Sequence, residues 1–257
     1  MRGTARRRVS FPNGRGQLLA GRLDLPEEGA PWAHAVLAHC FTCTKDLKAL
    51  YHMGGALAGA GVGALRVDFA GLGESEGDFA ETGLAANAED VVSAGRYLED
   101  EGRAPSLLVG HSLGGAAALL AARRLPSVRA VAVIATSADA GRLRESIIDS
   151  RASAGRGNRI PVKVGPRHFE LDPTFFEEME RTDVAGAARD LGLPLLVIHS
   201  ADDRLVPVAD GEALFQSAGH PKGFVSLTGV DHLLSEAADA TRVGGLIAAW
   251  ARLHVPD

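Results

Sequence analysis

The chain has 257 residues, of which 46% are hydrophobic and 23% are charged, and its formal net charge is −5 at pH 7. This length buries a core without a disulfide or metal, and its single basic cluster, at positions 2–8, is too local for a nucleic-acid groove. No apolar run approaches the about 18 residues of a membrane span or follows the N-terminal arginines as in a signal peptide, so we expect a cytoplasmic protein.

Two kinds of strand pattern alternate with helical segments along the chain. Residues 6–11 and 17–26 alternate polar with apolar side chains on either side of a "PNGRG" turn, which predicts an antiparallel hairpin. Six later segments are short and continuously apolar, which is typical of strands buried on both faces of a parallel sheet: 34–39, 63–69, 105–111, 128–136, 194–200 and 222–229. Helical spacing predicts helices in the segments 47–61, 84–102, 113–125, 208–219 and 236–253.

This order of elements predicts the fold class. An opening hairpin followed by alternating strands and helices indicates an α/β protein with a doubly wound, mostly parallel sheet of about eight strands. We expect residues 1–257 to form one domain. Residues 138–190, approximately, interrupt the pattern, because they are charged, rich in Arg and Gly and lack a buried strand. We expect a cap or lid insertion with short helices and a hairpin at "VKVGPRHFEL"; a surface excursion without regular structure is the alternative.

The strongest functional signal is "GHSLG" at 110–114, a G-x-S-x-G motif between a buried strand and a helix. In that setting the serine occupies a sharp strand-to-helix turn, and the flanking glycines avoid a clash. The turn lifts the Ser112 hydroxyl above the sheet and directs the Leu113 N–H and the helix N-terminus at a carbonyl oxygen. Ser112 is therefore the predicted nucleophile, and Leu113 a predicted oxyanion donor.

A serine hydroxyl needs a base, and the base needs an orienting carboxylate. His232 follows the last predicted strand, where a general base belongs, and we predict that it is the base. Asp203 follows the preceding strand, three residues before a Val-Pro pair that we expect to open a helix, and it is our preferred acid. Both strands end at one edge of the sheet, so both side chains are expected beside Ser112.

Three other aspartates lie near the strand ends. Asp139 follows the segment 128–136 and is a second candidate for the acid. Asp202 is expected to cap or pair on the surface. Asp231 is expected to fix the loop of the neighbouring histidine rather than to reach its ring.

These motifs resemble the α/β-hydrolase fold superfamily: "GHSLG", the D-x-x-V-P that starts at Asp203, the D-H at 231–232 and "VDFAGLGES" at 67–75. The resemblance covers nearly the whole chain and implies a Ser-His-Asp triad without a metal or organic cofactor. In "GLGESEG" the third glycine is out of register for a dinucleotide site. "AHCFTCTKD", "GHSLGGAA" and "HPKGFVSLTGVDHLL" are most similar to the serine hydrolase half of bifunctional proteins that also carry an OsmC-like domain; we expect that domain to be absent here.

Both cysteines lie in "HCFTC" at 39–43, where this fold places its second oxyanion donor. We expect that donor to be the backbone N–H of Phe41, with Cys40 in place of the glycine of many members. The alternatives are a redox dithiol of Cys40 and Cys43, or a zinc site that adds His39 and lacks a fourth ligand. A hydrolase would keep ester hydrolysis without either thiol, whereas a redox protein would lose its function.

The sequence therefore predicts a serine hydrolase that cleaves a carboxylic ester or thioester through an acyl-enzyme. Phe169, Phe175 and Phe176 are the main apolar side chains of the 138–190 segment, which indicates a pocket for a small to medium acyl group of a small-molecule substrate. A peptidase or a dienelactone or C–C hydrolase is the alternative within the same fold. A thiol redox or peroxide-response protein that uses Cys40 and Cys43 is the alternative of another class.

Overall fold

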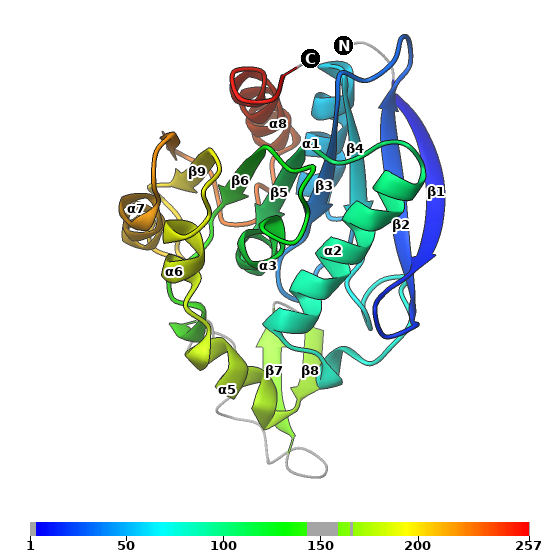
Figure 1. Cartoon of the computed structure of the whole chain (residues 1–257). Coiled ribbons are helices and arrows are strands. Elements are labelled where there is room, and N and C mark those ends of the chain that lie inside the picture. Colours follow the sequence, from blue (N-terminus) through cyan, green and yellow to red (C-terminus); the bar gives the residue numbers. More distant parts are fainter. Residues whose placement is uncertain (1–3, 143–158, 165–166, 257) are drawn as a thin grey trace.

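The main sheet has eight strands in the order β1-β2-β4-β3-β5-β6-β9-β10 (Figure 1). The computed structural model describes residues 4–142, 159–164 and 167–256. The strands of the sheet are β1 (Thr4–Pro12), β2 (Leu18–Pro26), β3 (Ala33–Ala38), β4 (Val62–Val67), β5 (Leu107–His111), β6 (Ala130–Ile134), β9 (Leu195–Ser200) and β10 (Lys222–Leu227). The pairs β1–β2 and β2–β4 are antiparallel and the others are parallel, which confirms the predicted fold class and its N-terminal hairpin.

Helices cover both faces of this sheet (Figure 1). One core cluster packs α1 (Lys48–Gly59) and α8 (Ala237–Ala251) on one face, and the other packs α2 (Leu84–Asp100), α3 (Leu113–Ala122) and α7 (Val208–Ser217) on the opposite face. Every residue of β5 and β6 is buried as a result, which explains why these strands are apolar without alternation. Within the described ranges, no helix is both long and apolar enough to cross a membrane.

Buried ion pairs fix the edge of this core beside β4. Arg66 in β4 is only 1% exposed, and its Nε donates to Asp24 Oδ2 at 2.7 Å. Lys45, in the loop after β3, is equally buried and its Nζ lies 2.8 Å from Asp68 Oδ2. Buried charges are tolerated when they are paired in this way. The Arg66–Asp24 pair ties β4 to β2, and the Lys45–Asp68 pair ties the loop after β3 to the end of β4.

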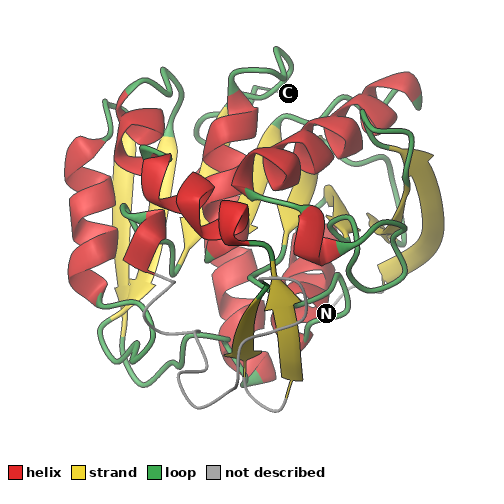
Figure 2. Ribbon diagram, turned by 90° about the horizontal axis from the view of Figure 1, so that it is seen from below, coloured by secondary structure: helices red, strands yellow, loops and turns green. Residues whose placement is uncertain are grey.

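The predicted insertion contains a second, small sheet, which lies apart from the main one (Figure 2). Here η2 (Ala140–Arg142) is followed by the antiparallel hairpin of β7 (Ile160–Val164) and β8 (Arg167–Leu171), and then by α5 (Pro173–Arg181) and α6 (Val184–Arg189). The hairpin lies where the sequence predicts it. Residues 143–158 and 165–166 of the predicted insertion lie outside the described residues.

Candidate active site

Ser112 occupies the turn between β5 and α3. Its φ of 53° and ψ of −118° are unusual for a residue with a side chain. The Ser112 N–H donates to the Ile134 carbonyl at 2.8 Å, and the Thr136 hydroxyl donates to the Ser112 carbonyl at 3.1 Å. Bonds to β6 and the residues after it therefore hold a strained turn in place, as is typical of a nucleophile on a strand–helix junction.

Glycines allow the backbone segments to approach closely around this turn. A Cβ on Gly110 would lie 2.3 Å from the carbonyl oxygen of Gly114. A Cβ on Gly114 would lie 2.4 Å from the carbonyl oxygens of Ala38 and His39, at the end of β3. The start of α3 therefore touches the loop after β3, which brings two backbone segments to the same side of Ser112.

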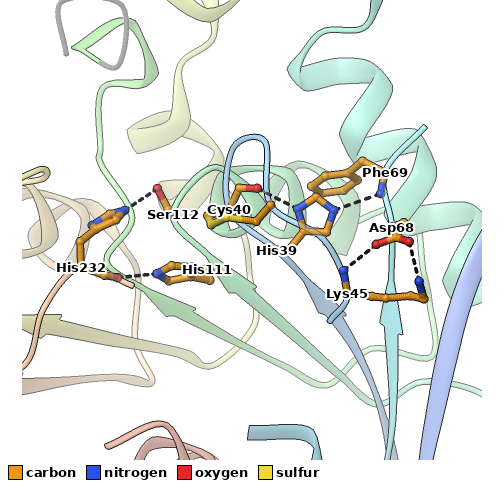
Figure 3. Close-up of a disulfide and its surroundings, with 9 residues drawn as sticks. His39, Cys40, Lys45, Asp68, Phe69, His111, Ser112 and His232 are labelled. Atoms are coloured by element: carbon orange, nitrogen blue, oxygen red, sulfur yellow. Dashed lines mark hydrogen bonds and ion pairs between the residues drawn. A yellow bond between two sulfur atoms is a disulfide. The ribbon is translucent and has the colours of Figure 1, made fainter. Parts of the chain in front are cut away.

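The imidazole of His232 links Ser112 to Asp203. Figure 3 shows the ring directed at the serine, with Nε2 3.2 Å from Ser112 Oγ. Its Nδ1 lies 2.7 Å from Asp203 Oδ2. A carboxylate acceptor at Nδ1 places the ring proton there, so Nε2 is free to accept the serine proton. All three side chains are buried, and the structure thus brings together the predicted nucleophile, base and acid.

The surroundings of Asp203 keep its carboxylate ionised. Its Oδ1 accepts the backbone N–H of Leu205 at 2.8 Å and of Val206 at 2.9 Å. Burial alone would raise the pKa of Asp203, but the hydrogen bond from His232 and those backbone bonds outweigh burial and lower the pKa below its ordinary value. The carboxylate therefore stays charged, as the partner of an imidazolium must.

The other aspartates at the strand ends bind backbone amides. Asp139 Oδ1 accepts the N–H of Gly141 at 3.0 Å, and Asp202 Oδ2 accepts that of Gly229 at 2.6 Å. Asp231 Oδ1 accepts the N–H of Ser235 at 2.8 Å. Asp203 bonds to the His232 ring, whereas these three carboxylates bind backbone amides. Asp231 fixes its own loop, as expected.

Two buried histidines outside the predicted site brace its loops. His111 Nε2 donates to the backbone carbonyl of His232 at 2.7 Å (Figure 3). Burial, together with the nearby His232, lowers the pKa of His111 to about 3, so His111 is neutral. His199 Nε2 donates to the Val206 carbonyl at 2.9 Å, within the loop that carries Asp203. The sequence places both histidines at strand ends but contains no signal of these bonds.

The two predicted oxyanion donors lie on the segments that meet at Gly114. Leu113 is the first residue of α3, and first-turn N–H groups have no acceptor within their own helix. Phe41 lies in the loop after β3, and its ring packs on Phe79 and Phe175 with centroids 5.6 Å apart in each case. The backbone amides of both residues belong to segments in contact beside Ser112.

The loop after β3 is closed by a disulfide between Cys40 and Cys43. Joined in this way, the two sulfurs provide no thiolate to the zinc site considered from the sequence. His39 Nδ1 donates to the Cys40 carbonyl at 2.7 Å, while its Nε2 accepts the N–H of Phe69 at 3.2 Å. Burial lowers the pKa of His39 to about 4, so the ring is neutral and fixes the Cys40–Phe41 peptide.

A narrow cavity opens above the serine. Its volume is about 40 Å³. Its apolar wall is formed by Leu113, Ala116, Met179, Leu205 and Val206, and its polar side by Ser112, Thr136, Ser137, Asp139 and Arg142. Arg142 Nη1 donates to Asp210 Oδ1 at 3.0 Å, and the Ser137 hydroxyl donates to Asp210 Oδ2 at 2.9 Å. The sequence gives no sign that Ser137, Arg142 and Asp210 interact, because 68 residues separate Arg142 from Asp210.

Known proteins resemble the chain along most of its length. A profile of the Alpha/beta hydrolase family matches residues 35–243. The esterase domain of a Rhodothermus marinus protein is 41% identical, with a TM-score of 0.80, and the match covers 98% of this chain and 100% of that one. The mitochondrial palmitoyl-protein thioesterase ABHD10 of Mus musculus is 29% identical over 56% of this chain and 49% of its own length. The Salmonella typhi protein YfhR is 24% identical over 78% of this chain and 65% of its own length.

The chain thus spans less than two thirds of both curated relatives. The profile match nevertheless includes the loop after β3, the strained serine turn, the acid and the histidine. Because the family profile matches more than half of its residues, the chain belongs to the alpha/beta hydrolase family.

Proposed function

We propose that this hydrolase is a serine hydrolase that cleaves a carboxylic ester or thioester through an acyl-enzyme. The observation that carries the proposal is the continuous bonded chain from Asp203 through His232 to Ser112. Ser112 attacks the acyl carbon while His232 Nε2 takes its proton, and Asp203 stabilises the resulting imidazolium. The backbone N–H groups of Phe41 and Leu113 bind the oxyanion.

The remaining steps of the reaction use the same groups. The imidazolium of His232 protonates the leaving alcohol or thiol, which departs and leaves the acyl group on Ser112. His232 then accepts a proton from water as its oxygen attacks the acyl carbon. The imidazolium returns that proton to Ser112 Oγ when the bond between Oγ and the acyl carbon breaks, which releases the carboxylic acid and regenerates the serine. His232 thus accepts or donates the proton in every step of the reaction.

The narrow cavity supports a small to medium acyl group. The insertion at about 138–190 contributes Asp139, Ala140, Arg142 and Met179 to the cavity lining, and we propose that this insertion acts as a cap on a single domain. The relatives named above include an esterase domain and a palmitoyl-protein thioesterase, which supports both acyl linkages. Membership of the bifunctional OsmC-linked subfamily and cytoplasmic location remain predictions.

A panel of p-nitrophenyl esters with acyl chains of two to sixteen carbons, paired with matched acyl thioesters, tests the substrate class. We expect kcat/KM to peak at chains of about eight carbons or fewer. The Ser112→Ala variant should lose turnover of every member of the panel. A preference for chains beyond about twelve carbons would contradict the small pocket, and efficient cleavage of peptides or lactones alone would favour the alternatives within this fold.

A further inference from the structure

The Cys40–Cys43 disulfide encloses the proposed oxyanion donor. Phe41 and Thr42 are the two residues between the cysteines, and the disulfide lies beside Ser112 (Figure 3). The Cys43 N–H donates to the Cys40 carbonyl at 3.1 Å, so the enclosed segment is a tight turn. Any constraint on this turn acts directly on the direction of the Phe41 N–H.

The turn needs a constraint, because Thr42 has a φ of +57°. A β-branched residue is a true outlier in this left-handed region, and surrounding structure must hold it there. The disulfide spans Thr42 and opposes its relaxation toward negative φ. Such a relaxation would turn the Phe41–Thr42 peptide, and through the backbone of Phe41 it would strain the adjoining Cys40–Phe41 peptide, which carries the donor N–H.

The disulfide is the covalent link across Thr42, and the hydrogen bond from the Cys43 N–H to the Cys40 carbonyl spans the same residue. On the N-terminal side of the turn, His39 Nδ1 donates to the Cys40 carbonyl. On the C-terminal side, the Lys45 N–H donates to Asp68 Oδ1 at 2.6 Å and Arg66 Nη1 donates to the Lys45 carbonyl at 2.6 Å. Opening the disulfide therefore removes the covalent link across the turn, while the loop stays attached to the sheet on both sides.

We propose that the Cys40–Cys43 disulfide positions the oxyanion donor, so that hydrolysis depends on the redox state of these two cysteines. The inference rests on the proposed function, because the Phe41 N–H matters only if an oxyanion forms on Ser112. It departs from the expectation that ester hydrolysis stays largely intact without the cysteines, because the proposal predicts hydrolysis with a clearly lower kcat.

The chemistry of the switch balances with an external dithiol. Cys43 is half-buried whereas Cys40 is 4% exposed, so Cys43 is the more accessible of the two for attack by a thiolate. Its attack breaks the Sγ–Sγ bond, forms a mixed disulfide on Cys43 and releases the Cys40 thiolate, which takes up a proton. The second thiol of the reductant then displaces the Cys43 thiol and leaves as the oxidised cyclic disulfide. Two electrons pass from the dithiol to the protein.

Kinetics of the oxidised and reduced protein test the proposal. The chain has two cysteines, both in this bond, so a reductant has one target. The protein is reduced with a water-soluble phosphine, which becomes the phosphine oxide, desalted without oxygen and assayed with a short-chain p-nitrophenyl ester. We expect kcat to fall about 10- to 100-fold. This fall is at most about the 100-fold loss that follows removal of a whole oxyanion donor. KM should change less than about 3-fold, and the pH at which kcat/KM is half-maximal should not change. Reoxidation should restore kcat.

Variants separate the bond from the sulfur atoms. Cys43→Ser and Cys40→Ser/Cys43→Ser should have the kcat of the reduced wild type, and the phosphine should not change it. Thr44→Ala, in the same loop with the bond intact, should keep the wild-type kcat and its response. If the cysteine variants fail to fold, the reversible response of the wild type alone decides the question.

Each outcome has a distinct meaning. Equal kcat in oxidised and reduced wild type overturns this inference and leaves the proposed function standing. A loss on reduction that comes with unfolding in circular dichroism also overturns it, because the bond then stabilises the fold rather than the donor. An oxidised protein that neither hydrolyses esters nor reacts with a fluorophosphonate overturns the proposed function, and this inference with it.

Discussion

His39, His111, His199 and His232 are all buried around the candidate site, yet each is fixed by a different bond. In His111 and His199 the Nε2 donates to a backbone carbonyl, and in His39 the Nδ1 does. In His232, Nδ1 meets a carboxylate and leaves Nε2 free for the serine. The role of each ring therefore follows from the acceptor at one nitrogen.

Neighbouring aspartates permit a matched test of the acid. In Asp203→Asn the amide no longer favours the His232 tautomer that accepts the serine proton, and we expect kcat to fall about 10³- to 10⁴-fold. Asp202→Asn, whose carboxylate binds the Gly229 N–H instead, should stay within about 3-fold of wild type. Steady-state ester hydrolysis measures both. A comparable loss in Asp139→Asn, with Asp203→Asn active, would transfer the acid's role to Asp139.

At the scale of elements, the junction of β5 and α3 depends on close backbone approach. Gly114 lies against the carbonyl oxygens at the end of β3, and Gly115 lies against Thr136. Each contact presses the start of α3 onto a neighbouring segment. The position of the Leu113 N–H relative to the loop after β3 follows from this packing.

Replacement of one helical glycine by alanine tests the junction. In Gly114→Ala the new Cβ would lie 2.4 Å from two carbonyl oxygens, so we expect about 1–3 kcal/mol of destabilisation and a drop in kcat of at least about 10-fold. In Gly245→Ala, on the exposed face of α8, the Cβ meets open space, and higher helix propensity should leave stability equal or slightly raised. Urea unfolding and ester hydrolysis of both variants give the comparison. Equal behaviour of the two would argue against a tight junction.

At the scale of the whole molecule, the sheet and its five covering helices follow from the sequence. Continuous apolar runs predict strands buried on both faces, and the structure has them at β3, β4, β5, β6 and β9. The prediction is wrong for β10, which is half-buried because it lies at the edge of the sheet. The candidate acid could also be predicted, because Asp203 ends one of these runs just before a helix that starts after Pro207.

The rest depends on contacts between distant segments. Two cysteines three residues apart are compatible with a dithiol, a metal site or a disulfide, and the turn conformation at Thr42 decides which distance they adopt. Arg66 lies in a run that reads as apolar core, and its burial depends on Asp24 from another strand. Pairs of this kind join segments that are distant in the chain, so they produce no periodic pattern from which they could be predicted.

Buried neutral histidines make the stability of the whole chain depend on pH. The pKa values of His39 and His111, about 4 and about 3, lie below the ordinary value of 6.5. The unfolded chain therefore binds more protons below pH 6.5, and stability falls as pH drops toward those values. Between pH 7 and 5 each ring should cost about 2 kcal/mol.

Urea unfolding at pH 7 and pH 5 measures this loss. His111→Asn keeps a donor for the His232 carbonyl but does not titrate, so its loss over this range should be smaller than that of the wild type by about 2 kcal/mol. The same loss in variant and wild type would mean that His111 is not a source of the pH dependence.

Covalent labelling shows whether Ser112 is the nucleophile of a serine hydrolase. A fluorophosphonate is incubated with the wild type, Ser112→Ala and Ser137→Ala, and intact mass is measured; Ser137 lines the same cavity. We expect one label per chain in the wild type and in Ser137→Ala, and none in Ser112→Ala. Labelling that survives Ser112→Ala would contradict the assignment of Ser112 as the nucleophile.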